Sequence, residues 1–477
     1  MDQETPIEAV IGLEVHIQLN TNSKAFCSDS AAFGSDPNTH VGTISLAHPG
    51  TLPMINKQQV AHAIKLGLAL GSEINTHSFF DRKHYFYADL PKGFQTTQDN
   101  QPICLGGSYR NIRLHHIHME EDAGKSLHEG EQTHSQIDFN RAGVPLLEMV
   151  TEPDFRSAEE VYQFIHALRQ LVQYLGISDG NMEEGSLRCD CNVSVRLLGD
   201  THLNNRCEVK NVNSARFARK AVEHEIARQT KLFRAGEIVD QQTREFDPLS
   251  GLTRMLRSKE DAYDYRYFPE PDLPPLIITE EWIAEIRSQI SELPDAKLAR
   301  YGEMGIDLKD SERLTSEQNG AVQFEAFLAT CEGSAAATAK FWINHVLPAE
   351  KEGRLPKPIE SAFSRMNEFL KIINADKITR SVAYQKLWPI AFDSDEPLEK
   401  IAQDLDILRG DGAFDISAMA AKVIADNPAE RDKYLQGKKS LLGFFMGQMM
   451  RLTKGKVDPE EAQREIQRQL EQSNKIS

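Results

Sequence analysis

The chain has 477 residues, of which 40% are hydrophobic and 26% charged, and its formal net charge is −17. This length exceeds what one hydrophobic core organises, so we expect two to four domains of ordinary globular composition. The acidic balance argues against binding nucleic acid or a membrane over the whole surface, but it leaves room for a local basic patch. No apolar run approaches the ~20 residues of a membrane span, and the acidic start MDQETPIEA does not resemble an export signal.

The cysteines are scattered and form neither a disulfide framework nor CxxC pairs. This usage predicts a reducing, cytoplasmic environment. The six residues are Cys27, Cys104, Cys189, Cys191, Cys207 and Cys331.

Residues 9–19, AVIGLEVHIQL, alternate in the way that predicts a half-buried strand. Glu14 and His16 lie on its second face, about 7 Å apart along the strand. A carboxylate beside an imidazole can hold a divalent cation or transfer a proton. Taken alone, the segment is explained better by a polar stripe on an edge strand.

A loop rich in Gly, Pro, Asp and Asn follows this strand, and residues 57–71 then predict an amphipathic helix. Residues 80–98, FDRKHYFYADLPKGFQTTQ, mix aromatic and charged side chains in an unusual density. Residues 111–126 begin as a strand and end in an acidic turn. Residues 137–154 carry Glu148 inside an apolar stretch.

Two serines predict helix starts, with Ser157 opening a capping box and Ser214 preceding a helix over residues 215–229. Between them, residues 187–197 form the clearest alternating strand, whose odd-numbered positions should face the core. Residues 243–276 predict a hairpin and a Pro-rich exit.

The composition changes near residue 280. Residues from about 295 to 405 have a helical pattern rich in Ala, Leu, Lys and Glu, and a small helical unit begins near residue 409.

The polar faces of these elements collect acidic residues that would repel one another without a cation or a basic partner. Mg²⁺ prefers such oxygen ligands together with substrate phosphates, and one His among carboxylates also suits Mn²⁺ or Zn²⁺. The pattern therefore favours a metal–nucleotide site, although separate surface ion pairs stay an alternative. The collected residues are Glu14, His16, Glu120, Glu121, Asp122, Glu148, Asp190 and Glu208, with Lys83, Lys92, Lys125, Arg188 and Lys210 as interleaved basic residues that could hold phosphate oxygens.

Other motifs are weaker. The GKS of HMEEDAGKS lacks the leading glycine of a phosphate-binding loop, and there is no GxSxG elbow. Cys27 has no context for a nucleophile, and Cys189 and Cys191 should face the core. Among the neighbouring histidines of residues 115–118, we expect His118 to pack on its strand rather than to bind a ligand.

The C-terminal unit is locally basic. Residues 431–456 hold seven Lys or Arg residues against a single acid, Asp432. This asymmetry predicts contacts with a phosphate backbone, and a solvated helix end is the alternative. We expect Lys438, Lys439, Arg451 and Lys454 to contact RNA.

Several of these segments resemble the GatB/GatE family of tRNA-dependent amidotransferase subunits, nearly from end to end and in order. They include IGLEVHIQL, HPGTLPMIN, FDRKHYFYADLPKGFQ, HMEEDAGKS, DFNRAGVPLLEMVTEPD, MEEGSLRCDCNVSVR, EVKNVNS, DYRYFPEPDLPPL and GKKSLLGFFMGQMMRLTKGKVDP. The resemblance implies an α+β chain. It would have a β-rich cradle over residues 1–294, a helical domain over 295–408 and a small tRNA-binding tail over 409–477.

The resemblance also implies an activity. In this family a heterotrimer amidates misacylated Glu-tRNA(Gln) or Asp-tRNA(Asn). An amidase A subunit frees ammonia from glutamine, and a small C subunit completes the complex. The family member itself holds the charged tRNA and phosphorylates the side-chain carboxylate with ATP and Mg²⁺ (Mn²⁺ possible), which makes the complex a cytoplasmic carbon–nitrogen ligase.

By motif, Glu14, His16, Glu121 and Glu148 match positions at or near the metal site. Glu121, Glu148, Arg188 and Asp190 are expected at the catalytic centre, with Glu208 in the same pocket as a residue that binds the cofactor. Arg188 and Lys210, chosen from their strand faces, would contact phosphate. Lys83 and Lys92 match the ammonia path.

One departure concerns zinc. Many family members carry a CxC…CxxC set here, but this chain has Cys27, Asp29, Gly42 and Ser45 in those places, so we expect no structural zinc. The chain also lacks room after Leu276 for the large insert of the archaeal branch, which favours the bacterial GatB type.

Two other functions stay open. The chain could be a non-catalytic RNA-binding scaffold, or a stand-alone ATP-dependent carboxylate ligase. The basic tail disfavours the ligase, and the acids inside apolar segments disfavour the scaffold.

Overall fold

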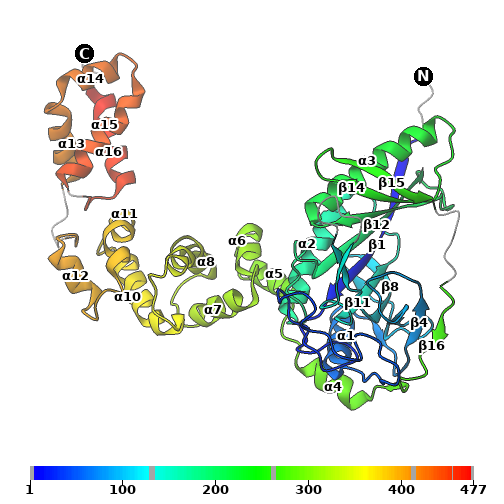
Figure 1. Ribbon diagram of the computed structural model, residues 1–477. Helices are drawn as coiled ribbons and strands as arrows, with labels where there is room; N and C mark the ends of the chain where they lie inside the picture. Colours follow the sequence, from blue (N-terminus) through cyan, green and yellow to red (C-terminus); the bar gives the residue numbers. More distant parts are fainter. Residues whose placement is uncertain (1–4, 128–134, 259–264, 410–414, 454, 474–477) are drawn as a thin grey trace. The chain divides into compact units, whose positions relative to one another are not determined.

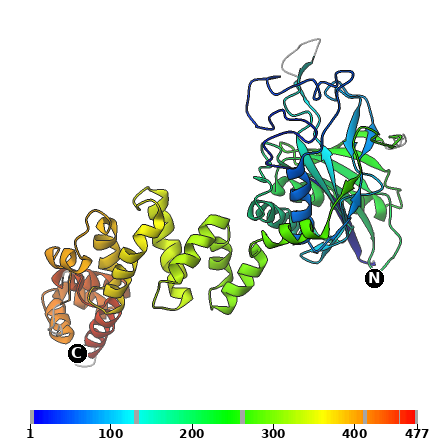
Figure 2. The same ribbon diagram turned by 90° about the horizontal axis from the view of Figure 1, so that it is seen from below.

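The computed structural model describes residues 5–127, 135–258, 265–409, 415–453 and 455–473. The chain forms two compact units, residues 1–299 and residues 300–477 (Figures 1 and 2). The predicted α+β organisation, with a β-rich part followed by helices, is confirmed. The three-domain division at 294/295 and 408/409 stays a prediction.

A ten-stranded sheet organises the first unit. From one edge to the other its strands are β15 (Leu252–Ser258), β14 (Gln242–Asp247), β13 (Cys207–Val212), β12 (Leu187–Leu197), β1 (Ile7–Gln18), β11 (Pro145–Thr151), β8 (Ile112–Glu121), β6 (Cys104–Leu105) and β2 (Glu73–Ile74), and β7 (Ser108–Tyr109) pairs with β8. A three-stranded sheet consists of β16 (Phe268–Pro269), β4 (Asp81–His84) and β5 (Phe94–Thr97). One two-stranded sheet pairs β9 (Lys125–Leu127) with β10 (Gln136–Asp138), and another pairs β3 (His77–Ser78) with β17 (Leu276–Ile277).

Strand β1 lies in the interior of this sheet, antiparallel to both β11 and β12. Its apolar side chains Leu13, Val15 and Ile17 are buried in one core that also receives side chains from several helices. They include α1 (Lys57–Ala69), α2 (Ala158–Tyr174) and α3 (Ala215–Arg234), of which α2 and α3 lie beside the sheet in Figure 1. The predicted strand is therefore correct, but it is not an edge strand.

Local sequence signals place most of these elements correctly. Ser157 Oγ accepts a hydrogen bond from Glu160 N at 3.2 Å and caps α2, and Ser214 caps α3. The Glu160 carboxylate accepts from Arg156 N rather than from the cap residue itself. Helix α3 continues to Arg234, beyond its predicted end, and Leu197 is exposed at the end of β12 although its alternation predicts burial.

A buried carboxylate ties the β14–β15 hairpin to α3. The Glu225 side chain is fully buried and receives hydrogen bonds from Arg228 (2.8 Å), Gln229 (3.0 Å) and Thr253, and it forms an ion pair with Arg244 (3.0 Å). Because Arg244 and Thr253 belong to the two strands of the hairpin, the predicted hairpin is held by one acid on the helix below it.

The first unit also contains α4 (Glu280–Ser288). The division between the two units falls within α5 (Pro294–Glu303). The second unit is helical and has two hydrophobic cores. The first core is formed by α6 (Leu308–Leu314), α7 (Gln318–Leu328), α8 (Ala335–Phe341), η1 (Trp342–Val346), α9 (Leu347–Lys351), η2 (Ile359–Ala362), α10 (Phe363–Asn374), α11 (Arg380–Val382), η3 (Ala383–Leu387), η4 (Trp388–Ile390) and α12 (Leu398–Asp404). The second is formed by α13 (Ile416–Ala425), α14 (Pro428–Leu435), η5 (Lys439–Leu441), α15 (Leu442–Leu452) and α16 (Pro459–Ser473). Within the described ranges, no helix combines the length and the apolar character needed to cross a membrane.

The Glu225 network generates a stability prediction. Glu225→Gln leaves two half-buried guanidinium groups without their buried counter-charge, so we expect a loss of about 3 kcal/mol in unfolding free energy at pH 7. Burial alone would raise the pKa of Glu225, but the hydrogen bonds from Arg228, Thr253 and Gln229 lower the pKa below its ordinary value. The stabilisation by the Glu225 carboxylate is therefore complete well above pH ~4.3, the ordinary pKa of a glutamate. It is lost as the pH falls from this value through the lower pKa that Glu225 has in the folded protein.

Urea unfolding of wild type and variant at pH 7 and pH 4 measures this difference, with hydrogen exchange of the β14 and β15 amides as the local readout. A difference that does not shrink at pH 4 would contradict the assignment.

Candidate functional site

Antiparallel pairing arranges polar side chains in rows across the face of the sheet opposite to the core. His16 on β1 pairs with Arg188 on β12 and with Glu148 on β11, and Glu148 pairs in turn with His118 on β8. Glu14 pairs with Asp190 in the next such row. Since cross-strand partners project from the same face, the register by itself gathers these groups.

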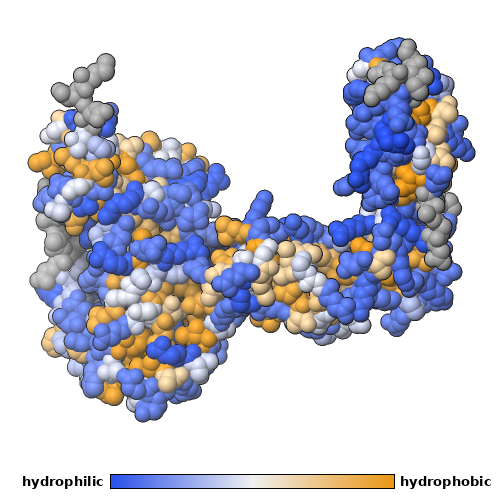
Figure 3. All heavy atoms as spheres, turned by 180° about the vertical axis from the view of Figure 1, so that it is seen from behind, coloured by the Kyte–Doolittle hydropathy of each residue, from blue (hydrophilic) through white to orange (hydrophobic). Residues whose placement is uncertain are grey.

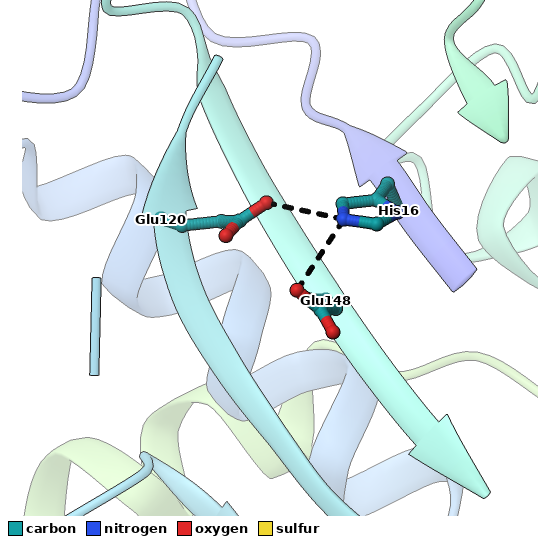
Figure 4. A group of neighbouring side chains, drawn as sticks. All are labelled: His16, Glu120 and Glu148. Atoms are coloured by element: carbon teal, nitrogen blue, oxygen red, sulfur yellow. Dashed lines mark ion pairs between the residues drawn. The ribbon is translucent and has the colours of Figure 1, made fainter. Parts of the chain in front are cut away.

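The first group joins His16, Glu120 and Glu148 (Figure 4). His16 Nε2 lies 3.5 Å from Glu120 Oε1 and 3.3 Å from Glu148 Oε2, and His118 Nε2 lies 3.4 Å from the same Glu148 oxygen. Gln95 donates a hydrogen bond to Glu120 Oε2 at 3.0 Å. One imidazole and two carboxylates that converge in this way match the donor set of Mg²⁺, Mn²⁺ or Zn²⁺.

The charges in this group stabilise one another. Burial would lower the pKa of His16, but Glu148 and Glu120 raise the pKa to about 9. Burial would likewise raise the pKa of Glu148, yet the adjacent His118 and His16 hold the pKa of that carboxyl well below its usual range. A divalent cation would take the place of the proton on His16, so binding would release that proton.

The second group joins Glu14, Asp190 and Glu208, whose ligand atoms all lie within 4.8 Å of one another. Lys210 Nζ lies 2.6 Å from Asp190 Oδ2 and 2.9 Å from Glu208 Oε1. Burial and then the charges of Glu148 and Glu208 raise the pKa of Glu14. The group has one ammonium for three carboxylates, which leaves a place for a further cation.

Asn192 is positioned to serve a cation in this second group. Its side chain is 93% buried, its Nδ2 donates to Glu14 Oε1 at 2.9 Å, and its Oδ1 has no partner among the described residues. If the amide were rotated by 180°, Oδ1 would lie where Nδ2 now lies, beside Glu14 Oε1, and both oxygens could bind one cation.

A cavity of about 760 Å³ lies over this face. His16, Glu120, Glu148, Arg188, Asp190, Lys210 and Lys83 line it. Glu14 borders a smaller recess of about 130 Å³ with Asn192 instead, so the two polar residues of β1 join different groups and contact the large cavity unequally. Asp190, the cross-strand partner of Glu14, lines the large cavity, whereas Glu14 does not.

Glu121 lies apart from both groups, although we expected it beside His16. Its Oε1 accepts hydrogen bonds from Thr96 N at 2.9 Å and from Lys92. Both residues line a second cavity of about 260 Å³, and Asp122, the next residue, lines both cavities. The cause is strand alternation, because Glu120 and Glu121 are consecutive on β8 and point to opposite sides.

The predicted basic residues occupy different settings. Arg188 Nη2 donates to Asp122 Oδ2 at 2.9 Å. Lys210 lies in the second acidic group. Lys83 and Lys92, expected on one path, lie in the large and the small cavity respectively.

His118 and Asn192 belong to the site but were not among the residues we collected for it, and Glu120 and Asp122 were collected without being given a role. The alternation of His116, His118 and Glu120 along β8 was a usable signal, because it repeats the pattern of Glu14 and His16 on β1. The role of Asn192 depends on cross-strand pairing with Glu208 and was not visible in the sequence.

The four positions expected to replace a zinc site do come together. Asp29 Oδ2 accepts hydrogen bonds from Gly42 N at 2.7 Å and from Ser45 Oγ at 2.5 Å, and Cys27 Sγ lies 3.4 Å from Ser45 Oγ. The fully buried Lys24 also donates to Ser45 Oγ, at 3.3 Å. One thiol, one carboxylate and an ammonium do not make a structural zinc site.

The basic C-terminal residues lie at the surface of the second unit. Lys438 and Lys439 are exposed at the start of η5, where Lys439 Nζ lies 4.2 Å from the Tyr434 ring centroid, and Arg451 is exposed near the end of α15. Lys454 lies outside the described residues. On the face drawn in Figure 3, hydrophilic residues predominate over the C-terminal helices.

Comparisons with known proteins agree along the chain. Residues 9–284 match the family model described as the GatB/GatE catalytic domain, and residues 323–470 match the model described as the GatB domain. A protein of Anaeromyxobacter sp. is 45% identical over 467 residues, covering 95% of this chain and 96% of its own. A protein of Syntrophotalea carbinolica is 43% identical over 474 residues, with 95% and 96% covered, and a Wolbachia protein is 44% identical over 468 residues, also with 95% and 96% covered. All three are named as the B subunit of an aspartyl/glutamyl-tRNA(Asn/Gln) amidotransferase.

The first acidic group generates a metal-binding prediction. Glu148→Gln removes the carboxylate that both imidazoles share, so we expect the affinity for Mn²⁺ to fall by at least about tenfold, measured by electron paramagnetic resonance titration. Glu237→Gln, at an exposed carboxylate outside both groups, should bind Mn²⁺ like the wild type. Equal affinity of all three proteins would exclude this metal site.

The loop around Asp29 generates a second prediction. We expect no stoichiometric zinc in the purified chain by elemental analysis. One zinc per chain would contradict the prediction that this loop binds no structural zinc. Asp29→Ala should increase hydrogen exchange at the amides of residues 42–45, because two hydrogen bonds worth about 1 kcal/mol each lose their acceptor. Asp36→Ala, at an exposed acid of the same loop, is the matched control.

Proposed function

Because the chain belongs to the GatB/GatE family, we propose that it is the B subunit of a glutamine-hydrolysing tRNA amidotransferase, a ligase that forms carbon–nitrogen bonds. The complex would convert misacylated Glu-tRNA(Gln), Asp-tRNA(Asn) or both into Gln-tRNA(Gln) and Asn-tRNA(Asn). The observation that carries this proposal is the first acidic group, which lines one cavity of about 760 Å³ together with Asp190 of the second group, Arg188 and Lys210.

The chemistry requires activation of a carboxylate. Ammonia cannot displace an oxide ion, so a carboxylate oxygen first attacks the γ-phosphorus of ATP and ADP leaves. The nitrogen of ammonia then attacks the carbonyl carbon of the acyl phosphate, inorganic phosphate leaves, and the nitrogen loses one proton to give the amide. Water must be kept away, because it would hydrolyse the acyl phosphate.

The described residues suit the first of these steps. Arg188 and Lys210 would bind phosphate oxygens, and their present acid partners hold both side chains at the cavity wall. Glu148 and His16, with Asp190, Glu208 and Glu14 nearby, would hold Mg²⁺. When bound, Mg²⁺ neutralises charge on the phosphoryl group during transfer.

We assign Glu121 to ammonia transfer rather than to metal binding, because it pairs with Lys92 in the smaller cavity. Ammonia from an amidase A subunit would pass this pair, follow Asp122 and reach Lys83 in the large cavity. A small C subunit would complete the heterotrimer. These groups offer hydrogen bonds that an uncharged polar molecule can exchange.

We further propose three working parts, a catalytic cradle over 1–294, a helical domain over 295–408 and a tRNA-binding tail over 409–477. Lys438, Lys439 and Arg451, with Lys454 outside the described residues, would contact the tRNA backbone. A complex that acts on charged tRNA would work in the cytoplasm.

The test measures ADP release by the chain together with its partner subunits. We expect release with Glu-tRNA(Gln) or Asp-tRNA(Asn) and only background with uncharged tRNA. No dependence on charged tRNA would refute the kinase role and leave an RNA-binding scaffold. Release with a free amino acid alone would favour a stand-alone carboxylate ligase.

Two variants separate catalysis from binding. Asp190→Asn should reduce ADP release by about 100-fold or more, as expected when a group that stabilises transferred charge is lost, while the Kd for tRNA is retained. Lys438→Ala with Lys439→Ala should weaken tRNA binding and reduce the slope of log Kd against log salt by about 2. Loss of tRNA binding in Asp190→Asn would mean that the acidic group is structural.

A further inference from the structure

Two segments far apart in the sequence bring four tyrosines together beside the large cavity. We call them the aromatic rim, and they are Tyr85, Tyr87, Tyr265 and Tyr267. The segments lie side by side, since His84 N donates to Tyr265 O at 2.9 Å and Phe268 pairs with Arg82 on β4.

Three ring contacts connect the tyrosines of the rim in the order Tyr87, Tyr85, Tyr265 and Tyr267. The ring centroids of Tyr85 and Tyr87 are 5.8 Å apart, those of Tyr85 and Tyr265 are 6.3 Å apart, and those of Tyr265 and Tyr267 are 6.2 Å apart. The interplanar angles lie between 66° and 72°. Such edge-to-face contacts fix the ring orientations.

The two ends of the rim are exposed. Tyr87 is 60% exposed and Tyr267 is 40% exposed. Among the described residues, the other aromatic side chains with comparable exposure are Phe33, Phe86 and Phe268. Apolar rings gathered at one place on a surface mark a binding site.

The rim is continuous with the proposed catalytic cavity. Tyr85 and Lys83 line this cavity together with His16 and Glu148. Lys83 Nζ also lies 4.8 Å from the Tyr265 ring centroid, which places a positive charge between the rim and the acidic groups. A ligand on the rim would therefore extend toward His16 and Glu148.

The proposed substrate supplies such a ligand. A tRNA ends in unpaired nucleotides, and the reacting amino acid is esterified to the last ribose. Unpaired bases bind proteins mainly by stacking on aromatic side chains, and a nearby lysine neutralises their phosphates. The adenine of ATP fits less well, because Arg188 and Lys210 lie on β12 and β13, across β1 and β11 from the rim.

We propose that the aromatic rim stacks the unpaired bases at the 3′ end of the aminoacylated tRNA and so positions the ester-linked carboxylate in the cavity. This inference rests on the proposed function, because it takes that tRNA as the substrate. Tyr87 and Tyr267 are then positioning residues that do not contact the reacting atoms.

A fluorescent base tests the stacking directly. The probe is a tRNA whose 3′-terminal adenine is replaced by 2-aminopurine, bound to the complex of the chain with its partner subunits. We expect quenching by the wild type, weaker quenching by Tyr267→Leu and by Tyr87→Leu, and restored quenching by Tyr267→Phe, which keeps the ring. Phe33→Leu, an exposed aromatic outside the rim, is the control and should quench like the wild type.

Steady-state kinetics provide the second readout. Tyr267→Leu should raise KM for charged tRNA by roughly tenfold, the effect of losing one base stack, with kcat and KM for ATP little changed. A rise in KM for ATP instead would assign the rim to the adenine of ATP. Loss of a partner subunit on purification would assign it to a protein interface. Unchanged quenching in both Leu variants would overturn the proposal outright.

These readouts separate the two proposals. If charged tRNA releases no ADP from the wild-type complex, the proposed function fails whatever the fluorescence shows. If ADP release depends on charged tRNA while the Leu variants quench like the wild type, the function stands and only the rim assignment fails.

Discussion

The register of β1 between β11 and β12 is the constraint on which the site depends. Because all three strands are antiparallel and in the interior of the sheet, Glu14 and His16 each have a fixed neighbour on either side. His16 therefore lies between Arg188 and Glu148, and Glu14 lies beside Asp190. A one-residue slip would place Val15 on this face and bury both polar groups in the core, so the packing of Leu13, Val15 and Ile17 specifies the chemistry on the opposite side.

Cationic side chains lie beside the acids of the site. In the first group two imidazoles neutralise Glu148, and in the second Lys210 serves two of three carboxylates. These partners differ in how easily a metal could displace them. A proton leaves an imidazole readily, whereas the ammonium of Lys210 would have to move as a whole. The two groups are thus unequal as cation sites, although their carboxylates are similar.

Much of the fold could be predicted from the sequence, because its signals are local. The alternation in β1 and β12 and the serine caps of α2 and α3 identify those elements, with errors confined to their ends. Convergence of Glu14, Asp190 and Glu208 depends on pairing between strands that lie almost 200 residues apart in the sequence, and no local pattern encodes it. The placement of Glu121 has another cause, since motif matching grouped it with Glu14 and His16 while alternation along β8 turns it toward the smaller cavity.

The end of β8 divides the two cavities with three consecutive acids. Glu120 faces the large cavity, Glu121 the small one, and Asp122 borders both. Successive side chains of a strand point to opposite faces of the sheet. One residue inserted or deleted here would therefore exchange the acids between the two cavities. Evolution could lengthen the loop over residues 20–56 at little cost, but it must preserve the residue count of this short segment.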